Sequence, residues 1–239
     1  MKGIILAAGL GNRLGELTRE IPKPMIRIGD IPIIEYTINL FKKASIKDII
    51  INLHYKPDII KDYLGNGRQF GVRITYSQEK ILLGTAGAVK NMERLLKKTF
   101  IVAYGDTLRK NINIKEMIQM HKDKKADVTV ALYNIGDSKD FGIIKMRKDN
   151  SILEFIEKPK RIVDRKNTYA NCGVYVIEPG VLSGIPENHS YDFASDLFPR
   201  LIKDGYRLYG YPTKSYLLDI GTPESYANAR KVFRMFKDL

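Results

Sequence analysis

Short apolar runs alternate with stretches of helical period through the first half of this chain, and this alternation limits the folds that the chain can adopt. The predicted strands cover residues 2–8, 48–53, 72–76 and 99–104. The predicted helices between them cover residues 32–43, 58–64 and 85–97. Strands that are separated by helices cannot pair as hairpins, so they are expected to lie parallel, with right-handed crossovers. The first half therefore predicts an α/β fold.

Beyond residue 125 the predicted strands follow one another more closely. They cover residues 127–133, 142–146, 152–157, 169–177, 207–211 and 216–220, with helices at 193–203 and from Pro223 onward. No repeat, low-complexity tract or linker divides the chain. We predict a single domain over residues 1–239, with a first half at 1–125 and a second half at 126–239, built on a mixed, mainly parallel sheet flanked by helices.

Composition excludes several classes of protein. The chain is 44% hydrophobic and 28% charged, which is typical of a globular protein and not of a disordered one. Its apolar runs fall far short of the roughly 20 residues of a membrane helix, so no membrane segment is predicted. The single cysteine, Cys172, cannot form an internal disulfide and is expected in a buried strand. This favours a reducing compartment, the cytoplasm.

The chain is basic, with 40 Lys and Arg against 27 Asp and Glu, a formal net charge of +13. Such a field attracts polyanions, including nucleotides and nucleic acids. The basic residues are scattered in small groups without a basic stripe, so nucleic acid is not expected as a partner. His54, His121 and His189 lack metal-ligand spacing and are expected to lie at the surface or at caps.

Ligands of parallel sheets bind beyond the carboxyl ends of the strands, and three glycine or acid features lie there. They are Gly9–Gly11, Gly84–Gly87 and Gly105–Asp106. Glycines let backbone N–H groups approach a phosphate closely. The first loop is neither a Rossmann fingerprint nor a P-loop. It is instead followed by Arg13 and by Lys23, which stands between two prolines on a stiff stretch.

The first of these motifs resembles the signature of a known family. Leu-Ala-Ala-Gly-Leu-Gly-Asn-Arg-Leu at Leu6–Leu14, followed by Pro22-Lys23-Pro24, is similar to the signature of the sugar-1-phosphate nucleotidylyltransferases, or sugar nucleotide pyrophosphorylases. Further similar blocks follow in family order: Leu83–Ala88, Gly105–Asp106, Phe141–Gly142, Phe155–Pro159, Asn171–Tyr175 and Asp219–Pro223. The resemblance covers nearly the whole chain. It implies a Rossmann-like sheet of the nucleotide-diphospho-sugar transferase type.

The resemblance also implies a reaction and its residues. A sugar-1-phosphate oxygen attacks the α-phosphate of a nucleoside triphosphate and pyrophosphate leaves, so two anionic reactants must be held together. By resemblance Arg13, Lys23, Asp106 and Asp219 are catalytic, and Asp106 and Asp219 bind Mg²⁺ as cofactor. The implied nucleotide contacts are Ala8, Gly9, Gly11, Asn12, Gly84, Thr85 and Gly87. The implied sugar-phosphate contacts are Gly142, Glu157, Lys158 and Asn171.

The substrates are less constrained than the reaction. Gly-Thr-Ala-Gly-Ala at residues 84–88 looks most like the mannose-1-phosphate guanylyltransferases, which favours GTP and mannose-1-phosphate. The helix that follows is expected to offer free N–H groups near the base. Heptose-1-phosphate with GTP and glucose-1-phosphate with dTTP or UTP remain alternatives within the sugar class. CTP with a phosphorylated alcohol and a non-catalytic nucleotide-binding regulatory subunit lie outside it.

Two residues depart from the family pattern. Asn12 stands where the family usually has Thr or Ser, and Gly15 where it usually has Pro. Asn12 can still donate to a phosphate, whereas Gly15 predicts a looser loop. The short stretch after the final helix predicts no left-handed β-helix domain. The oligomeric state stays open, with a homodimer as one candidate.

Overall fold

The structure is a computed structural model that describes residues 1–134, 143–156, 169–213 and 216–233. The chain divides into two compact units. The first combines Met1–Leu82, Val102–Lys110 and the described residues from Leu217 onward, and the second combines Leu83–Ile101 with the described residues of Asn111–Tyr216. Both predicted halves of the chain therefore contribute to both units, and neither unit begins or ends at residue 125.

The first unit contains the parallel strands that the sequence predicts. They are β1 (Lys2–Leu6), β4 (Asp48–Leu53), β5 (Arg73–Gln78) and β6 (Phe100–Tyr104), in the order β6-β1-β4-β5, and β6 enters this unit from the other. β4 pairs parallel with both β1 and β5. Ile4, Ile5 and Ile49–Ile51 are buried, as expected for strands covered on both faces.

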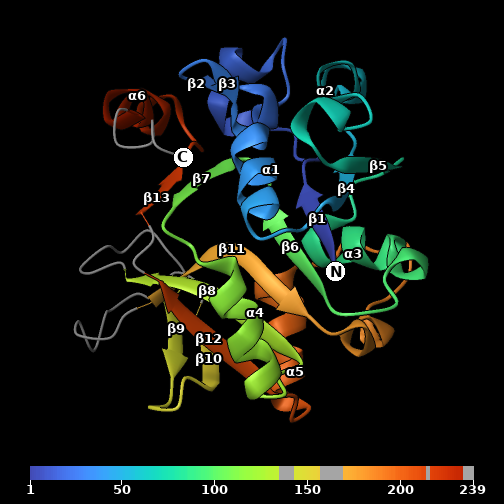
Figure 1. Cartoon of the computed structure of the whole chain (residues 1–239), viewed down its shortest axis with the longest axis vertical. Coiled ribbons are helices and arrows are strands. Elements are labelled where there is room, and N and C mark those ends of the chain that lie inside the picture. The colour runs from blue at the N-terminus through green and yellow to red at the C-terminus, as the bar shows by residue number, and fades with distance from the viewer. Residues whose placement is uncertain (135–142, 157–168, 214–215, 234–239) are drawn as a thin grey trace. The chain divides into compact units, whose positions relative to one another are not determined.

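Helices and short pairs of strands complete the first unit (Figure 1). The helices are α1 (Ile33–Lys43), α2 (Pro57–Leu64) and α6 (Pro223–Val232), with 3-10 turns η1 (Asn12–Thr18), η2 (Lys23–Met25) and η3 (Arg68–Phe70). β2 (Arg27–Ile28) pairs with β3 (Ile31–Pro32), and β7 (Thr107–Lys110) pairs with β13 (Tyr216–Asp219). α1 packs on β1 because Ile34, Ile38 and Phe41 form one buried face.

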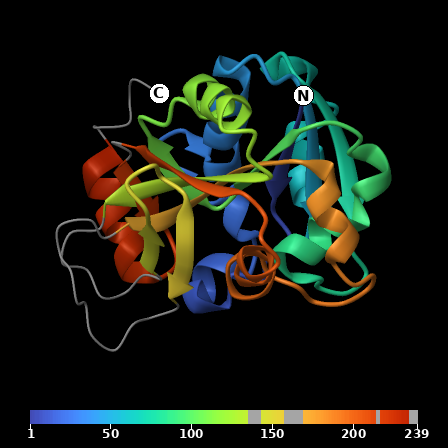
Figure 2. The same ribbon diagram turned by 90° about the horizontal axis from the view of Figure 1, so that it is seen from below.

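The second unit carries the remaining strands. β10 (Ile152–Ile156), β9 (Ile143–Met146) and β11 (Tyr169–Ile177) are antiparallel neighbours, and β8 (Val128–Asn134) pairs with β11 and, in parallel, with β12 (Leu208–Thr213). The helical elements are α3 (Gly84–Asn91), η4 (Glu93–Leu95), α4 (Ile114–Asp123), η5 (Pro179–Gly184), η6 (Phe193–Leu197) and α5 (Phe198–Lys203). α5 packs against β10, and the rings of Phe155 and Phe198 lie 5.1 Å apart. Figures 1 and 2 show these elements as ribbons.

The predicted fold class, a mixed and mainly parallel sheet flanked by helices, is confirmed. One predicted helix is wrong in extent, since α3 ends at Asn91 instead of about residue 97. The predicted 193–203 helix has the right extent, but its first turn is the π-type η6 and only α5 is α-helical. The sequence prediction also missed β7 and α4. The signal for α4 was present, since Asn113 caps it by accepting a hydrogen bond from the Glu116 N–H group, 3.3 Å away.

Burial decides the expectations for one cysteine and one histidine. Cys172 is buried, as predicted, but His121 is only 2% exposed, so its predicted surface or cap role is wrong. The longest helix among the described residues is α1, with 11 residues, and no described helix is long and apolar enough to span a membrane.

Candidate active site

The loop after β1 is fixed at several points within the first unit. Gly15 has φ +54° and ψ −123°, a backbone conformation that favours glycine. The Thr18 hydroxyl closes the loop by donating towards the carbonyl oxygens of Gly11 and Gly15, at 3.0 and 3.2 Å. Leu14 is buried in an apolar cluster with Ile220 and Ala229 near the C-terminal helix. Gly15 therefore turns the chain within an anchored loop, and the looser loop predicted from it is not what these contacts indicate.

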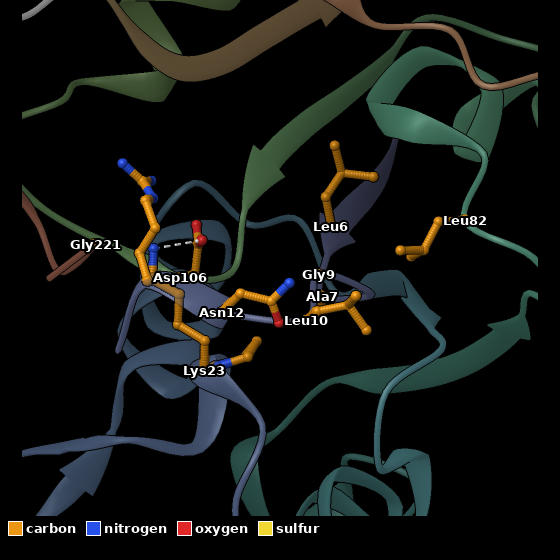
Figure 3. Close-up of a pocket in the computed structure, with 12 residues that line it drawn as sticks. Leu6, Ala7, Gly9, Leu10, Asn12, Lys23, Leu82, Asp106 and Gly221 are labelled. Carbon is orange, nitrogen blue, oxygen red and sulfur yellow. Dashed lines mark ion pairs between the residues drawn. The ribbon is translucent and has the colours of Figure 1, made fainter. Parts of the chain in front are cut away.

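This loop forms one wall of a pocket of about 360 Å³. The lining residues are Leu6, Ala7, Gly9, Leu10, Gly11, Asn12, Arg13, Lys23, Pro24, Leu82, Asp106 and Gly221. Figure 3 shows Lys23 and Asp106 together on one side of the pocket, with Leu6 and Leu82 on the other. The pocket thus has a charged side and an apolar side.

Six predicted site residues meet at this pocket: Gly9, Gly11, Asn12, Arg13, Lys23 and Asp106. Ala8 is 7% exposed and does not appear among the described lining residues. The sequence prediction missed Leu82, whose only signal was an apolar side chain just before the Gly84–Gly87 motif. It also missed Gly221, although this residue lies within the block that begins at Asp219.

Lys23 and Asp106 form an ion pair on the charged side of the pocket, with Lys23 Nζ 2.7 Å from Asp106 Oδ2. Pro22 and Pro24 flank Lys23 in η2, and Asp106 follows the end of β6. Burial is the largest single influence on the pKa of the Asp106 carboxyl and would raise it, but the ammonium of Lys23 together with Arg109 and Thr107 lowers this pKa below its ordinary value. The carboxylate is therefore ionised and available to a cation.

Arg109 holds the turn that carries Asp106 through hydrogen bonds to its backbone. This arginine is only 4% exposed, and its Nη1 donates to the carbonyl oxygens of Tyr104 and Thr107, both at 2.9 Å. The Thr107 hydroxyl also donates to Asp106 Oδ1 at 3.2 Å. Arg109 and Thr107 contribute to the lowered pKa of Asp106. Neither was among the predicted site residues.

The second predicted metal ligand, Asp219, ends β13, which pairs with β7. The Asp219 side chain lies outside what the structure describes. Within the described residues no group of three or more His, Cys, Asp or Glu side chains could hold a metal ion.

The Gly84–Gly87 segment lies in the second unit, and its backbone contacts a distant part of the chain. The Ala86 and Gly87 N–H groups donate to the Tyr191 carbonyl oxygen at 2.8 and 2.9 Å. A Cβ atom on Gly84 would lie 2.8 Å from that same oxygen, so glycine permits this approach. The expectation of free N–H groups at this helix start is wrong for both residues.

Thr85 also forms hydrogen bonds with this distant part of the chain. Its N–H group and its hydroxyl both donate to Asp192 Oδ1, at 3.1 and 2.8 Å, while its hydroxyl oxygen accepts from the Phe193 N–H group at 2.9 Å. We call Tyr191–Phe193 the clamp segment. The predicted nucleotide contacts of Gly84, Thr85 and Gly87 stay predictions, and they would have to be made beside the clamp segment.

Most of the predicted sugar-phosphate residues cannot be placed. Gly142, Glu157 and Lys158 lie outside the described residues. Asn171 lies in β11, where its Nδ2 donates to the Tyr175 hydroxyl at 2.6 Å and its Oδ1 accepts from the Gly173 N–H group at 2.7 Å. A sugar hydroxyl at Asn171 would have to share or replace these bonds.

Comparisons with known proteins agree with this architecture. The nucleotidyl transferase family model matches residues 2–234. The mannose-1-phosphate guanylyltransferase of Mycobacterium tuberculosis is 32% identical over 225 residues, which are 93% of this chain and 62% of that protein. The UTP–glucose-1-phosphate uridylyltransferase of Synechocystis is also 32% identical, over 243 residues that cover 96% and 62%.

A solved structure is similar over almost its whole length. It is a Bacillus anthracis protein, assigned as a glucose-1-phosphate thymidylyltransferase and solved with a sucrose, with a TM-score of 0.86 and 28% identity over 98% of this chain and 95% of that one. The chain spans about 62% of the length of the two curated relatives. On its sequence blocks, its fold and the family match across both units, the chain belongs to the nucleotidyl transferase family.

Proposed function

We propose that this protein transfers a nucleotidyl group from a nucleoside triphosphate to a sugar-1-phosphate, giving a nucleoside diphosphate sugar and pyrophosphate. The observation that carries the proposal is the pocket after β1, where an anchored glycine loop meets Arg13, Lys23 and Asp106. A polyphosphate requires cations and backbone N–H groups on one side of its pocket. The apolar side at Leu6 and Leu82 suits the flat face of a base.

Each charged residue then has a role that its position supports. The backbone of Gly9–Asn12 binds the phosphates of the nucleotide. Arg13, exposed at the rim of the pocket, neutralises the charge of the leaving pyrophosphate. Lys23 meets the α-phosphate, because its ammonium is almost fully withdrawn from water and already points into the pocket. An incoming phosphate would compete with Asp106 for this ammonium.

The residues present fit Mg²⁺ as cofactor. Asp106 supplies an ionised carboxylate at the charged side of the pocket, and Asp219 is the proposed second ligand. Bound there, Mg²⁺ would neutralise phosphate charge that Arg13 and Lys23 leave uncompensated. In the proposed site Asp106 would exchange its contact with Lys23 for a contact with the metal, which frees the lysine for phosphate.

We further propose GTP and mannose-1-phosphate as the substrate pair, with Gly142, Glu157, Lys158 and Asn171 on the sugar phosphate. The Gly84–Ala88 form and the guanylyltransferase relative favour this pair, whereas the uridylyl and thymidylyl relatives favour glucose-1-phosphate. The single buried cysteine, Cys172, supports a reducing compartment as the site of action.

The deciding experiment measures pyrophosphate release from a matrix of substrates. GTP, UTP, dTTP, CTP and ATP are each combined with mannose-, glucose-, N-acetylglucosamine- and heptose-1-phosphate, with Mg²⁺ and with chelator. One dominant pair that chelator silences is the expected result, and GTP with mannose-1-phosphate is the expected pair. Folded protein that releases pyrophosphate from no pair would overturn the proposal and favour a non-catalytic nucleotide-binding subunit.

A further inference from the structure

The point where β1 leaves its sheet depends on a buried side chain that no motif in the sequence singles out. β1 ends at Leu6, which is in parallel register with Asn52 of β4. The next N–H group, that of Ala7, donates to Asn52 Oδ1 at 2.7 Å in a buried hydrogen bond. A side chain therefore replaces the backbone ladder at the residue where the chain turns into the glycine loop.

The nitrogen of the same amide also has a buried hydrogen-bond partner. Asn52 Nδ2 donates to Glu79 Oε1 at 2.8 Å, and Asn52 and Glu79 are 2% and 4% exposed. Glu79 is itself tied to β4, because its N–H group donates to the Leu53 carbonyl oxygen at 2.8 Å. Its own carbonyl oxygen lies 3.0 Å from His54 Nδ1. If the Asn52 amide were flipped, its Nδ2 would face the Ala7 N–H group, which is also a donor, and its Oδ1 would face Glu79 Oε1, which is also an acceptor.

The two ends of this amide belong to opposite walls of the pocket. Ala7 begins the wall made by the glycine loop, and Glu79 begins the short segment that brings Leu82 to the other wall. Asn52 lies behind both walls and is withdrawn from solvent. We propose that Asn52 is a positioning residue that sets the conformation of the phosphate-binding loop relative to the opposite wall. This inference rests on the proposed function, because it assumes that the loop binds phosphate.

The test uses Asn52→Asp, which keeps an acceptor for the Ala7 N–H group but removes the donor to Glu79 and sets a second carboxylate against it. Binding of inorganic pyrophosphate, measured by calorimetry, is expected to weaken about tenfold. The KM for the nucleoside triphosphate should rise in parallel, while kcat at saturation stays within about twofold. A merely structural role would lower the unfolding temperature without this selective loss of phosphate affinity.

A second substitution tests the same contact from the other side. Adding Glu79→Gln to Asn52→Asp restores a donor and an acceptor in reversed order, so pyrophosphate affinity is expected to return. Asn66→Asp is the matched control, because the exposed side chain of Asn66 accepts a local bond from the Arg68 N–H group, 3.1 Å away, and an aspartate oxygen can accept the same bond. It should bind pyrophosphate like the unaltered protein.

Unaltered pyrophosphate affinity in folded Asn52→Asp would overturn the inference, and so would a folded double variant that still binds weakly. If Asn52→Asp does not fold, the double variant must recover both folding and binding. Because pyrophosphate binding needs no turnover, an absence of catalysis in the substrate matrix would refute the proposed function without deciding this point. Unaltered protein that does not bind pyrophosphate at all would refute both.

Discussion

The ion pair between Lys23 and Asp106 decides how both residues should behave when altered. An isolated aspartate at the end of a strand could be replaced by asparagine with little effect on stability. Asp106, however, lies 2.7 Å from the ammonium of Lys23, a residue that is only 7% exposed. Removing one partner of such a pair leaves the other charge withdrawn from water and without the opposite charge that lay against it.

We expect Asp106→Asn to lower turnover about 10²- to 10³-fold, the scale seen when one electrostatic contact to a transition state is lost. We also expect it to lower the free energy of unfolding by about 1–2 kcal/mol, because Lys23 loses its anion and the pair is partly open to solvent. Steady-state kinetics and urea denaturation measure the two effects. Full Mg²⁺-dependent activity in this variant would refute the metal assignment.

A second substitution separates the two effects of Asp106→Asn. Adding Lys23→Met removes the buried ammonium that has lost its contact with Asp106, so the double variant is expected to recover stability without recovering activity. If stability stays low in the double variant, the ion pair is not the cause of the loss.

His121 makes the stability of the second unit depend on pH. Its ring lies between the Thr129 hydroxyl, 2.9 Å from Nδ1, and a Glu178 oxygen, 3.2 Å from Nε2. Burial lowers the pKa of His121 below its ordinary value, and the attraction of Glu178 offsets burial only in part. The proximity of a carboxylate would suggest a charged imidazole, but the buried ring with two satisfied nitrogens favours the neutral form.

The sign of the pH effect follows from this pKa. The unfolded chain binds a proton at His121 more readily than the folded one, so the stabilisation is complete above about pH 6.5 and is lost as pH falls towards the lower folded pKa. Urea denaturation between pH 7.5 and 5 should therefore show a falling free energy of unfolding, whose slope is smaller in His121→Gln. An unchanged slope in His121→Gln would show that His121 does not cause the pH dependence.

At the scale of elements, α3 depends on a cap from elsewhere in the chain. This helix has only eight residues, and its first N–H groups are satisfied by the clamp segment instead of by its own N-cap residue, Leu83. A short helix is marginal by itself, so the clamp segment stabilises it by supplying acceptors at its positive end.

Substitutions of Asp192 test this capping. Asp192→Ala removes the acceptor of two hydrogen bonds from Thr85 and is expected to cost about 1–2 kcal/mol in the free energy of unfolding. Asp192→Asn keeps an oxygen acceptor and should lower the free energy of unfolding by only about a few tenths of a kcal/mol. Urea denaturation of the two variants gives the comparison. Equal losses in both would mean that charge, and not hydrogen bonding, carries the effect.

At the scale of the whole molecule, the net charge of +13 should act on anionic substrates before they bind. Electrostatic attraction raises association rates at low salt, and salt screens it. We expect kcat/KM for the nucleotide to fall about three- to tenfold as KCl rises from about 0.05 to 0.5 M, with kcat changed much less. A kcat/KM that does not depend on salt would show that the basic residues serve solubility alone.

Strand positions were predictable because a buried parallel strand must be apolar along its whole length. The 48–53 run matches the parallel strand β4 at both ends. The end of α3 was not predictable in this way, since its apolar stripe continues past Asn91 while the helical hydrogen bonds stop there. β7 was missed because Leu108 alone among its residues carries an apolar signal, and pairing with the distant β13 defines the strand.

Apolar periodicity and the order of short motifs are local properties of the chain, so they were sufficient to predict the fold class, the family and the residues that carry charge into the pocket. What those residues contact depends on how distant segments come together. The burial of His121, the cap of α3 by Asp192 and the bridge from Asn52 to Glu79 each join residues 8 to 107 positions apart. Such contacts depend on which strands become neighbours, and no local pattern records that choice.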